Sequence, residues 1–472
     1  MPTTTSNPNV VDEIIKSFQL PDDSLTVITQ KILEAFKLGT DGNPNGLAMT
    51  PTFVTSVPNG TEKGTFLTLD FESAAFRVSQ VKLDGKRNLS SADKIVDLSA
   101  QDKTGEATAF FDLVADSVRG FLAENGIQGS TSNPLPLGVT FGFPVQKTGI
   151  KNAKLAAWTK GFSVQNAVGK DVSTLLQDAL DRKKIPVKCV SVVNDTAAIF
   201  LAQSYLSGGC VLAAIFGVGT NGAFPEEIAK IKKLHNTPSL STTGKMILNT
   251  EWGAFDNQAS ISNRNVLPRT PYDNKLHRES LRPGFQSFEK MVSWMYLGEI
   301  ARNIFVFLID QSPPALFGGK STPALNAQFG FDSYYLTLVE QANSLTDIKA
   351  VLVEHLGLKS EDISDADASI VRAVSIAVTT RSARLAACAV AAGLVYRGHL
   401  ALGPRAPAGP KLPVAVYGEL MLLYPQFQTR LHEALTAITG KGTQERVDFI
   451  QVKDGGALGA ALSAFEATTI QK

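Results

Sequence analysis

The chain has 472 residues, of which 44% are hydrophobic and 19% are charged. A chain of this length is too long for one compact core, so we expect two lobes in a protein of ordinary globular composition. The formal net charge of +1 excludes the general positive field that would attract nucleic acid or an anionic membrane, and we expect neither as a direct partner.

The first half of the chain alternates between helical and strand patterns. Residues 10–38 have the periodicity of amphipathic helices, and residues 107–125 predict a further helix that ends near Gly126. Residues 64–82 predict a hairpin with its turn at 72–75. Two apolar runs, 137–143 and 187–193, predict buried strands.

The second half begins with an apolar strand at 210–216 that leads into a glycine-rich turn. It mirrors the first hairpin, so we interpret the two as a weak internal repeat, one per lobe, facing each other across a cleft. Long helices are predicted at 285–309 and 366–396, and a proline-rich loop at 404–413 precedes a strand at 414–417. A small-residue helix is predicted at 457–467, after Asp454-Gly455-Gly456.

The three cysteines are widely spaced and match no metal-binding pattern. Cys189 and Cys210 lie in apolar runs, which favours buried, reduced thiols and a reducing compartment, cytoplasmic or nuclear. We find no secretory segment and no apolar run long enough to span a bilayer, and we expect no membrane partner.

Short motifs distributed over nearly the whole chain resemble those of eukaryotic hexokinases, in the same order and at similar spacing. They are Pro58-Asn59-Gly60-Thr61-Glu62-Lys63-Gly64, Phe141-Gly142-Phe143-Pro144, Trp158-Thr159-Lys160-Gly161-Phe162, Val193-Asn194-Asp195-Thr196, Gly217-Val218-Gly219-Thr220-Asn221, Asn249-Thr250-Glu251-Trp252-Gly253 and Pro283-Gly284-Phe285-Gln286 with Glu289. The closest likeness is to the atypical hexokinases of filamentous fungi. That likeness implies a role in carbon-source signalling or starvation response, with a regulatory protein partner.

The resemblance implies an α/β, two-lobed, actin-like ATPase fold with a sugar-binding cleft between a small and a large lobe. It divides the chain into a helical segment (1–48) packed on the large lobe, the small lobe (49–193), the large lobe (194–455) and a C-terminal helix (456–472) that returns to the small lobe.

On the sugar side the family residues are largely kept. A hexose needs many directional hydrogen bonds from fixed polar side chains. The matching positions are Thr159, Lys160, Asn194, Asp195, Asn221, Glu251, Gln286 and Glu289. The resemblance implies that Asp195 is the general base for the 6-hydroxyl, that Lys160 orients the substrate, and that glucose is the default hexose. Gly142 departs from the family serine, which removes a hydroxyl contact worth about 0.5–1.5 kcal/mol.

The nucleotide side departs from the family in several places. Phosphoryl transfer needs close backbone approach to the phosphates, which glycine permits. Hexokinases carry Asp-Leu-Gly-Gly-Thr-Asn in the first phosphate turn, and this chain has Asp70-Phe71-Glu72-Ser73-Ala74-Ala75. Asp70, which the family uses through water to hold magnesium, is kept. Glu72 adds a carboxylate to this turn. Its repulsion of a phosphate about 4 Å away would cost on the order of 4 kcal/mol at an effective dielectric constant near 20.

Three further segments on the nucleotide side also depart from the family pattern. Trp294 stands where a small residue is usual, and its indole is predicted to plug the pocket. The adenosine segment reads Tyr417-Gly418-Glu419, with an acid in place of a hydroxyl. The second phosphate turn keeps Gly219 and Thr220, whereas a family threonine has become Val218.

These observations favour a hexokinase-like protein that binds a hexose but transfers phosphate poorly, acting as a sensor or regulator. The alternative is an active hexokinase that uses Mg-ATP, with Asp195 as base. A third reading is an interaction protein that uses neither ligand.

Overall fold

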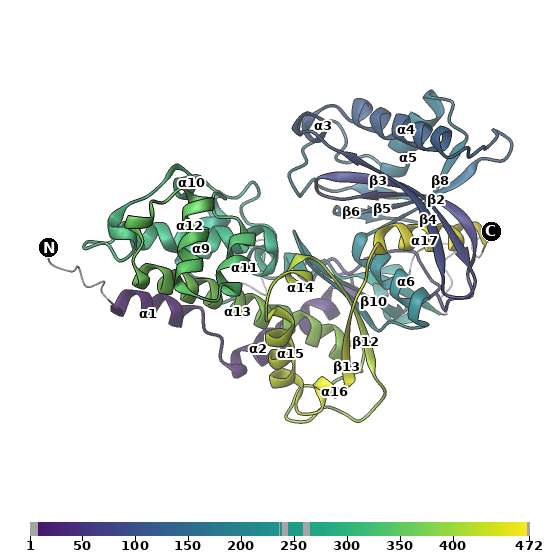
Figure 1. Ribbon diagram of the computed structural model, residues 1–472. Helices are drawn as coiled ribbons and strands as arrows, with labels where there is room; N and C mark the ends of the chain where they lie inside the picture. Colours follow the sequence, from purple (N-terminus) through teal and green to yellow (C-terminus); the bar gives the residue numbers. More distant parts are fainter. Residues whose placement is uncertain (1–7, 236, 238–243, 258–264, 470–472) are drawn as a thin grey trace.

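The computed structural model describes residues 8–235, 237, 244–257 and 265–469. Two β-sheets form the centres of two lobes, as Figure 1 shows. The arrangement confirms the predicted two-lobed α/β fold.

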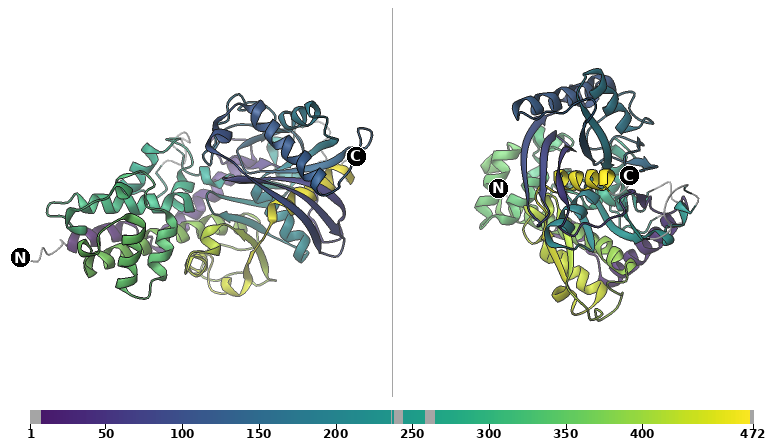
Figure 2. Two further views of the ribbon diagram at one scale, coloured as in Figure 1. Left: turned by 45° about the horizontal axis from the view of Figure 1, so that its top comes forward. Right: turned by 90° about the vertical axis from the view of Figure 1, so that its right-hand side faces the viewer.

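The small lobe is built on a five-stranded sheet in the order β4-β3-β2-β5-β8. Its strands are β2 (Lys63–Phe71), β3 (Ala75–Asp84), β4 (Leu89–Asp97), β5 (Leu135–Phe141) and β8 (Val187–Val193). Helices α4 (Ala107–Glu124) and α5 (Val172–Arg182) cover one face, and α17 (Gly455–Thr469) covers the other (Figures 1 and 2). The small elements α3 (Ala100–Thr104), β6 (Val145–Lys147) and β7 (Ala153–Leu155) complete this lobe.

The large lobe is built on a six-stranded sheet in the order β1-β11-β10-β9-β12-β13. Its strands are β1 (Thr50–Pro51), β9 (Leu212–Phe216), β10 (Thr220–Glu227), β11 (Lys245–Asn249), β12 (Leu412–Tyr417) and β13 (Val447–Gln451). The helices are α1 (Pro8–Ser17), α2 (Asp22–Thr40), α6 (Asp195–Ser207), α7 (Pro271–Glu279), α8 (Ser287–Val292), α9 (Trp294–Ile309), α10 (Pro323–Asn326), α11 (Ser333–Gln341), α12 (Leu345–Leu356), α13 (Asp365–Tyr396), α14 (Glu419–Leu422), α15 (Phe427–Thr439) and α16 (Thr443–Arg446).

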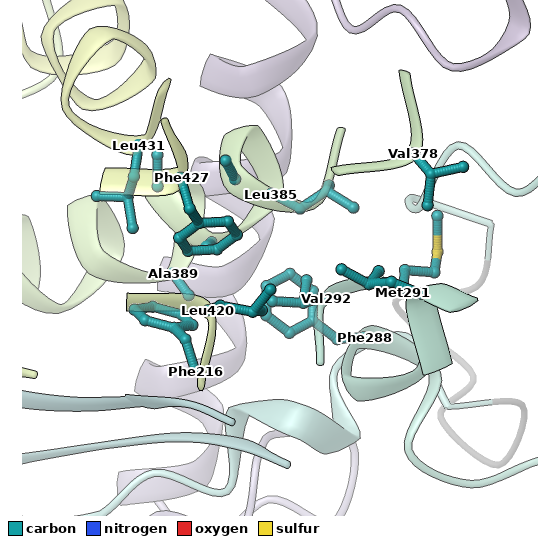
Figure 3. Close-up of a cluster of buried hydrophobic side chains, with 14 of the residues drawn as sticks. Phe216, Phe288, Met291, Val292, Val378, Leu385, Ala389, Leu420, Phe427 and Leu431 are labelled. Atoms are coloured by element: carbon teal, nitrogen blue, oxygen red, sulfur yellow. The ribbon is translucent and has the colours of Figure 1, made fainter. Parts of the chain in front are cut away.

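Helix α13 runs through the large-lobe core and packs against α2 and α15. Figure 3 shows part of this core, which includes Phe216 of β9, Phe288 of α8 and Phe427 of α15. The ring centroids of Phe216 and Phe427 lie 6.0 Å apart. By length and composition α13 is apolar enough to cross a membrane, which the sequence had not suggested, but 72% of its apolar window is buried inside the protein. Its apolar residues therefore supply the core.

Both predicted hairpins are present: β2 and β3 pair antiparallel around residues 72–74, and β9 and β10 pair around 217–219. The repeat places the two phosphate turns in different lobes, at the same cleft. Residues 50–51 pair with β11 in the large-lobe sheet, although the predicted boundary at 48/49 had assigned them to the small lobe. Parts of the first and last predicted segments, 1–7 and 470–472, lie outside the described residues.

The helix predicted at 285–309 is wrong as one element, because it is two helices separated at Ser293. This residue has an extended backbone (φ −81°, ψ 148°), and the next amide, that of Trp294, donates to the Gly217 carbonyl at 2.8 Å. The break therefore ties the start of α9 to the second phosphate turn.

Candidate functional site

A cavity of about 1070 Å³ lies between the lobes. All eight residues predicted to contact a hexose line it, namely Thr159, Lys160, Asn194, Asp195, Asn221, Glu251, Gln286 and Glu289. They come from loops after β7, β8 and β11 and from the β10 and α8 region. Residues distant in sequence thus converge on one site.

Asp195 begins α6, directly after the buried strand β8. Asn194 caps this helix by accepting from the Thr196 amide at 2.9 Å, and a carboxylate in the first helical turn is favoured by the helix dipole. The Lys160 ammonium donates to Asp195 Oδ2 at 3.0 Å. Burial would lower the pKa of Lys160, but the Asp195 carboxylate raises this pKa above its usual value. The pair therefore fixes a carboxylate beside a positive charge in the cleft.

Gly142 lies directly against this pair. A Cβ atom added at Gly142 would lie 2.4 Å from Asp195 Oδ2 and 2.8 Å from Lys160 Nζ. The glycine that replaces the family serine thus leaves the space into which the ion pair fits.

Three side chains form a relay on the large-lobe wall. Asn221 donates from Nδ2 to Asn249 Oδ1 at 2.6 Å, and Asn249 donates from Nδ2 to Glu251 Oε1 at 2.6 Å. The Glu251 amide closes the circuit by donating to Asn221 Oδ1 at 3.0 Å. Asn249 is buried and was missed as a site residue, although it stands in a quoted motif. Because it orients both neighbours, it is a positioning residue.

Glu289 links the second phosphate turn to the hexose wall. Its Oε2 accepts from the Thr220 amide at 3.1 Å, and its Oε1 accepts from Gln286 Nε2 at 3.4 Å. The Thr220 hydroxyl accepts a hydrogen bond from Trp252 Nε1 at 2.9 Å. The turn is therefore held by groups of the sugar site.

Burial raises the pKa values of two acids on the large-lobe wall of the hexose cavity. Desolvation raises the pKa of Glu251 to about 7, against the lowering effect of its hydrogen bond from Asn249, and the neighbouring Asp195 and Glu289 add to the rise. Burial also raises the pKa of Glu289. Glu251 is thereby able to change protonation near neutral pH.

A second, smaller cavity of about 140 Å³ lies at the two phosphate turns. It is lined by most of the predicted nucleotide residues, including Asp70, Glu72, Ser73, Gly219, Tyr417 and Glu419, and by Asp454. The backbone of the first turn closes on itself, because the Glu72 amide donates to the Ala75 carbonyl at 2.9 Å and the Leu98 amide donates to the Ala74 carbonyl at 2.9 Å. The acidic side chains of Asp70, Glu72, Glu419 and Asp454 line this cavity together with the cations Arg77 and Lys160.

Arg77 is the cation nearest the first turn, and the sequence reasoning did not single it out. It donates from Nη1 to Asp454 Oδ1 at 2.6 Å, and its Nη2 lies 3.8 Å from Glu72 Oε1. The Glu72 side chain is 48% exposed, so its repulsion of a phosphate is screened and falls below the value expected for a buried pair. Arg77 is therefore already paired with carboxylates.

The acid in the adenosine segment reaches the second turn. A Cβ atom added at Gly217 would lie 2.5 Å from Glu419 Oε2. Gly418, with φ of 113°, sits so close to the Phe216 carbonyl that an added Cβ would lie 2.4 Å from it. Because the backbone at Gly418 lies this close to the end of β9, the side chain of Glu419 lines the phosphate cavity.

Trp294 lies elsewhere. Its side chain is partly buried and packs against the large-lobe core, and it lines neither of the two cleft cavities. The structure thus gives no support to the prediction that this indole plugs the nucleotide pocket, because the break at Ser293 turns it toward the core.

The charge state of Asp70 bears on how this cavity could hold magnesium. Desolvation by burial, followed by repulsion from Glu72, raises the pKa of Asp70 to about 7, so a proton competes for the carboxylate that the family uses toward magnesium. Among the described residues, no group of three or more His, Cys, Asp or Glu side chains is placed to hold a metal ion. The two cations that line this cavity, Arg77 and Lys160, are each already paired with a carboxylate, whereas a triphosphate is held by free positive charge.

Comparison with known proteins identifies the family of this chain. Two family models described as hexokinase match residues 10–205 and 211–465. A glucokinase from Aspergillus niger is 35% identical, over 96% of this chain and 96% of its own. Hexokinase-1 of Schizosaccharomyces pombe is 34% identical, over 97% and 90%.

Solved structures give the same result. The hexokinase of Schistosoma mansoni complexed with glucose superposes with a TM-score of 0.86 at 32% identity, and the match covers 97% of this chain and 98% of that one. The chain belongs to the hexokinase family.

Proposed function

We propose that this protein binds a free hexose in the cleft between its lobes, with the 6-hydroxyl facing Asp195. The support is the convergence of the eight polar residues on one cavity and the fixed Lys160–Asp195 pair. The Schistosoma relative, which carries glucose in its solved structure, makes glucose the first sugar to test.

The second half of the proposal is that phosphoryl transfer from ATP is weak. One observation carries it: Asp70, Glu72, Glu419 and Asp454 surround a single small cavity. Its two cations are already paired, Arg77 with Asp454 and Lys160 with Asp195. A triphosphate entering there would meet like charge and would have to displace an existing ion pair.

A hexose that binds the closed state better than the open state would shift the lobes toward closure without chemistry. In this account a protein partner that recognises the closed form completes a regulatory switch. The carbon-source or starvation role, and the cytoplasmic or nuclear location, rest on the resemblance to atypical fungal hexokinases.

Glucose titration followed by tryptophan fluorescence tests the hexose half. Trp158 is buried in the small-lobe wall, where its Nε1 donates to the Val164 carbonyl at 2.8 Å, so closure should change its emission. A saturable response that is lost in Asp195→Ala supports the proposal. No response at millimolar glucose would leave only the reading of a sugar-independent interaction protein.

An active hexokinase is the second candidate. It is favoured by the intact Asp195 and Lys160 geometry and by relatives named glucokinase and hexokinase. A coupled assay for hexose 6-phosphate, at saturating glucose and Mg-ATP, separates the two candidates. Turnover within the ordinary range of about 1–1,000 per second would establish the second.

A further inference from the structure

The last turn of helix α14 presents two leucines to solvent. Leu422 and Leu423 are 46% and 48% exposed, whereas Leu420 and Met421 of the same turn are buried. The Leu423 amide donates to the Glu419 carbonyl at 2.8 Å, so the helical turn extends through Leu423. The turn therefore has a core face and an apolar face that is open to solvent.

The solvent face of α14 adjoins the phosphate cavity through Glu419. Residues three and four apart on a helix lie on the same face, so Leu422 and Leu423 flank the Glu419 side chain. Glu419 lines the phosphate cavity together with Tyr417, which is 39% exposed. We define Tyr417, Leu422 and Leu423 as the apolar patch, and it lies beside this cavity.

The segment that carries the patch is held in place from the core side. The Met421 carbonyl accepts from Gln451 Nε2 at 2.9 Å, and the Tyr424 hydroxyl donates to Glu340 Oε2 at 2.6 Å. Glu340 is itself paired with Arg430. The patch is therefore preorganised, which lowers the cost of binding to it.

The cavity beside the patch contains unpaired negative charge. The two cations that line it are each paired with a carboxylate, whereas the carboxylates of Asp70 and Glu419 have no hydrogen-bond or ion-pair partner in the part of the chain that the structure describes. The Tyr417 hydroxyl responds to this charge, because burial and then repulsion by Glu72 and Glu419 raise its pKa to about 12. An added cation would be attracted to this cavity.

The carboxylates of the cavity come from both lobes. Asp70 and Glu72 belong to the first phosphate turn of the small lobe, and Glu419 follows β12 in the large lobe. A cation between them is attracted more strongly as the lobes approach, because the attraction between opposite charges grows as their separation falls. Binding of a cation here would therefore depend on lobe closure.

We infer that the apolar patch is a docking surface for a protein segment that carries apolar side chains beside a lysine or an arginine. The apolar side chains cover Leu422 and Leu423, and the cation enters the phosphate cavity. Burial of apolar surface supplies affinity, and charge complementarity selects a basic segment over an acidic one. The inference rests on the proposed function, since it identifies where the regulatory partner recognises the closed form.

Selection from a phage-displayed library of random dodecapeptides, on the full chain with saturating glucose, tests this inference. We expect the enriched peptides to share a Lys or Arg next to Leu, Ile or Phe. A synthetic copy of an enriched peptide, followed by fluorescence anisotropy, should bind at least about fivefold more tightly with glucose than without it, which is the lower end of ordinary allosteric coupling.

Variants of α14 localise the peptide. The double variant Leu422→Ser and Leu423→Ser should weaken peptide binding at least about tenfold and leave the tryptophan response to glucose unchanged. A repeated selection on Glu419→Gln should enrich Lys and Arg less strongly. Ile95→Ser is the control for an exposed apolar residue, because Ile95 is 61% exposed on β4 and lines neither cleft cavity.

Several results would overturn the inference and leave the proposed hexose function standing, provided that glucose still changes the fluorescence. They are no enrichment, enrichment without a basic residue, equal binding with and without glucose, and undiminished binding to the double variant. A molar mass by light scattering that doubles in the wild type, and not in the double variant, would make a second copy of the chain the occupant. If Mg-ATP binds and displaces the peptide, the cavity is a nucleotide site and the proposed function itself fails.

Discussion

The guanidinium of Arg77 donates to the carboxylate of Asp454 at 2.6 Å, joining β3 to the loop that leads into α17. The contact neutralises the cation nearest the first phosphate turn. On the other side of the same cavity, the Glu419 carboxylate lies against Gly217. Both features support the proposal that this site holds a triphosphate weakly, since one pairs a cation and the other adds a carboxylate.

Removing the added acids should restore triphosphate binding. The combined variant Glu72→Gly, Ser73→Gly and Glu419→Ser brings back bare backbone and deletes two negative charges. We expect the Mg-ATP affinity to rise at least about tenfold, or about 1.4 kcal/mol, because each carboxylate repels the phosphates at short range. Calorimetry measures this.

The control for that experiment is Glu433→Ser, which removes an exposed acid on α15 that lines neither cleft cavity. An equal gain in the control would assign the effect to net charge. No gain in the combined variant would contradict the assignment of Glu72 and Glu419 as the cause of weak binding.

Hexose affinity should depend on pH through Glu251. Burial raises the pKa of Glu251 to about 7, so the ionised form, which accepts from ring hydroxyls, grows about tenfold between pH 6 and pH 8. Glucose should therefore bind more tightly at pH 8 than at pH 6. Fluorescence titrations at the two pH values measure the difference.

Glu251→Gln should bind glucose more weakly at both pH values and show a flatter profile. A wild-type affinity that rises toward pH 6 would show that the neutral acid, acting as a donor, is the binding form.

Asn249 should matter for sugar binding although it was not predicted as a site residue. Asn249→Ala leaves Asn221 and Glu251 without the group that orients them, and an unsatisfied buried polar group costs about 1–3 kcal/mol. We expect glucose affinity to fall about tenfold or more. The same variant should lose little of the tryptophan response at saturating glucose, because the sugar still closes the lobes. If affinity is unchanged, the relay has no positioning role.

The stability of the large lobe should depend on one buried ion pair. Arg381 on α13 contacts both oxygens of Asp273 on α7, at 2.7 and 2.6 Å, and both side chains are buried. Asp273→Asn leaves a buried charge unpaired, which costs about 3–5 kcal/mol of unfolding free energy. Urea unfolding measures the loss.

Helix α7 also offers the matched control. Glu279 pairs with Lys275 at the surface, and Glu279→Gln should cost less than about 1 kcal/mol. Equal losses of unfolding free energy in the two variants would mean that burial does not determine how much each ion pair contributes to stability.

Much of the fold could be predicted because the strands that form the sheet centres are largely apolar. Residues 210–216 are wholly apolar, and residues 187–193 are apolar apart from Lys188 and Ser191. The ends of these two strands position the second phosphate turn and Asp195. β4 was missed because it is an edge strand with several exposed polar residues, which leaves little apolar alternation to detect. The break at Ser293 was missed because a tertiary hydrogen bond, from Trp294 to Gly217, creates it.

The site residues likewise divide into those that could be predicted from the sequence and those that could not. The eight hexose residues could be located because each stands in a motif, and the cavity includes them all. Arg77 and Asn249 could not be assigned, since their importance lies in partners that are distant in sequence, Asp454 and Asn221. The orientation of Trp294 was likewise set by backbone geometry that composition does not reveal.

The most direct test is to titrate Mg-ATP into the protein by calorimetry with saturating glucose present. Glucose first establishes the closed cleft, so a lack of nucleotide binding cannot be ascribed to an open state. The account predicts no binding up to millimolar Mg-ATP. Binding in the micromolar to low-millimolar range would contradict it, and would make the protein an ATP-dependent hexose kinase to be assayed over a panel of hexoses.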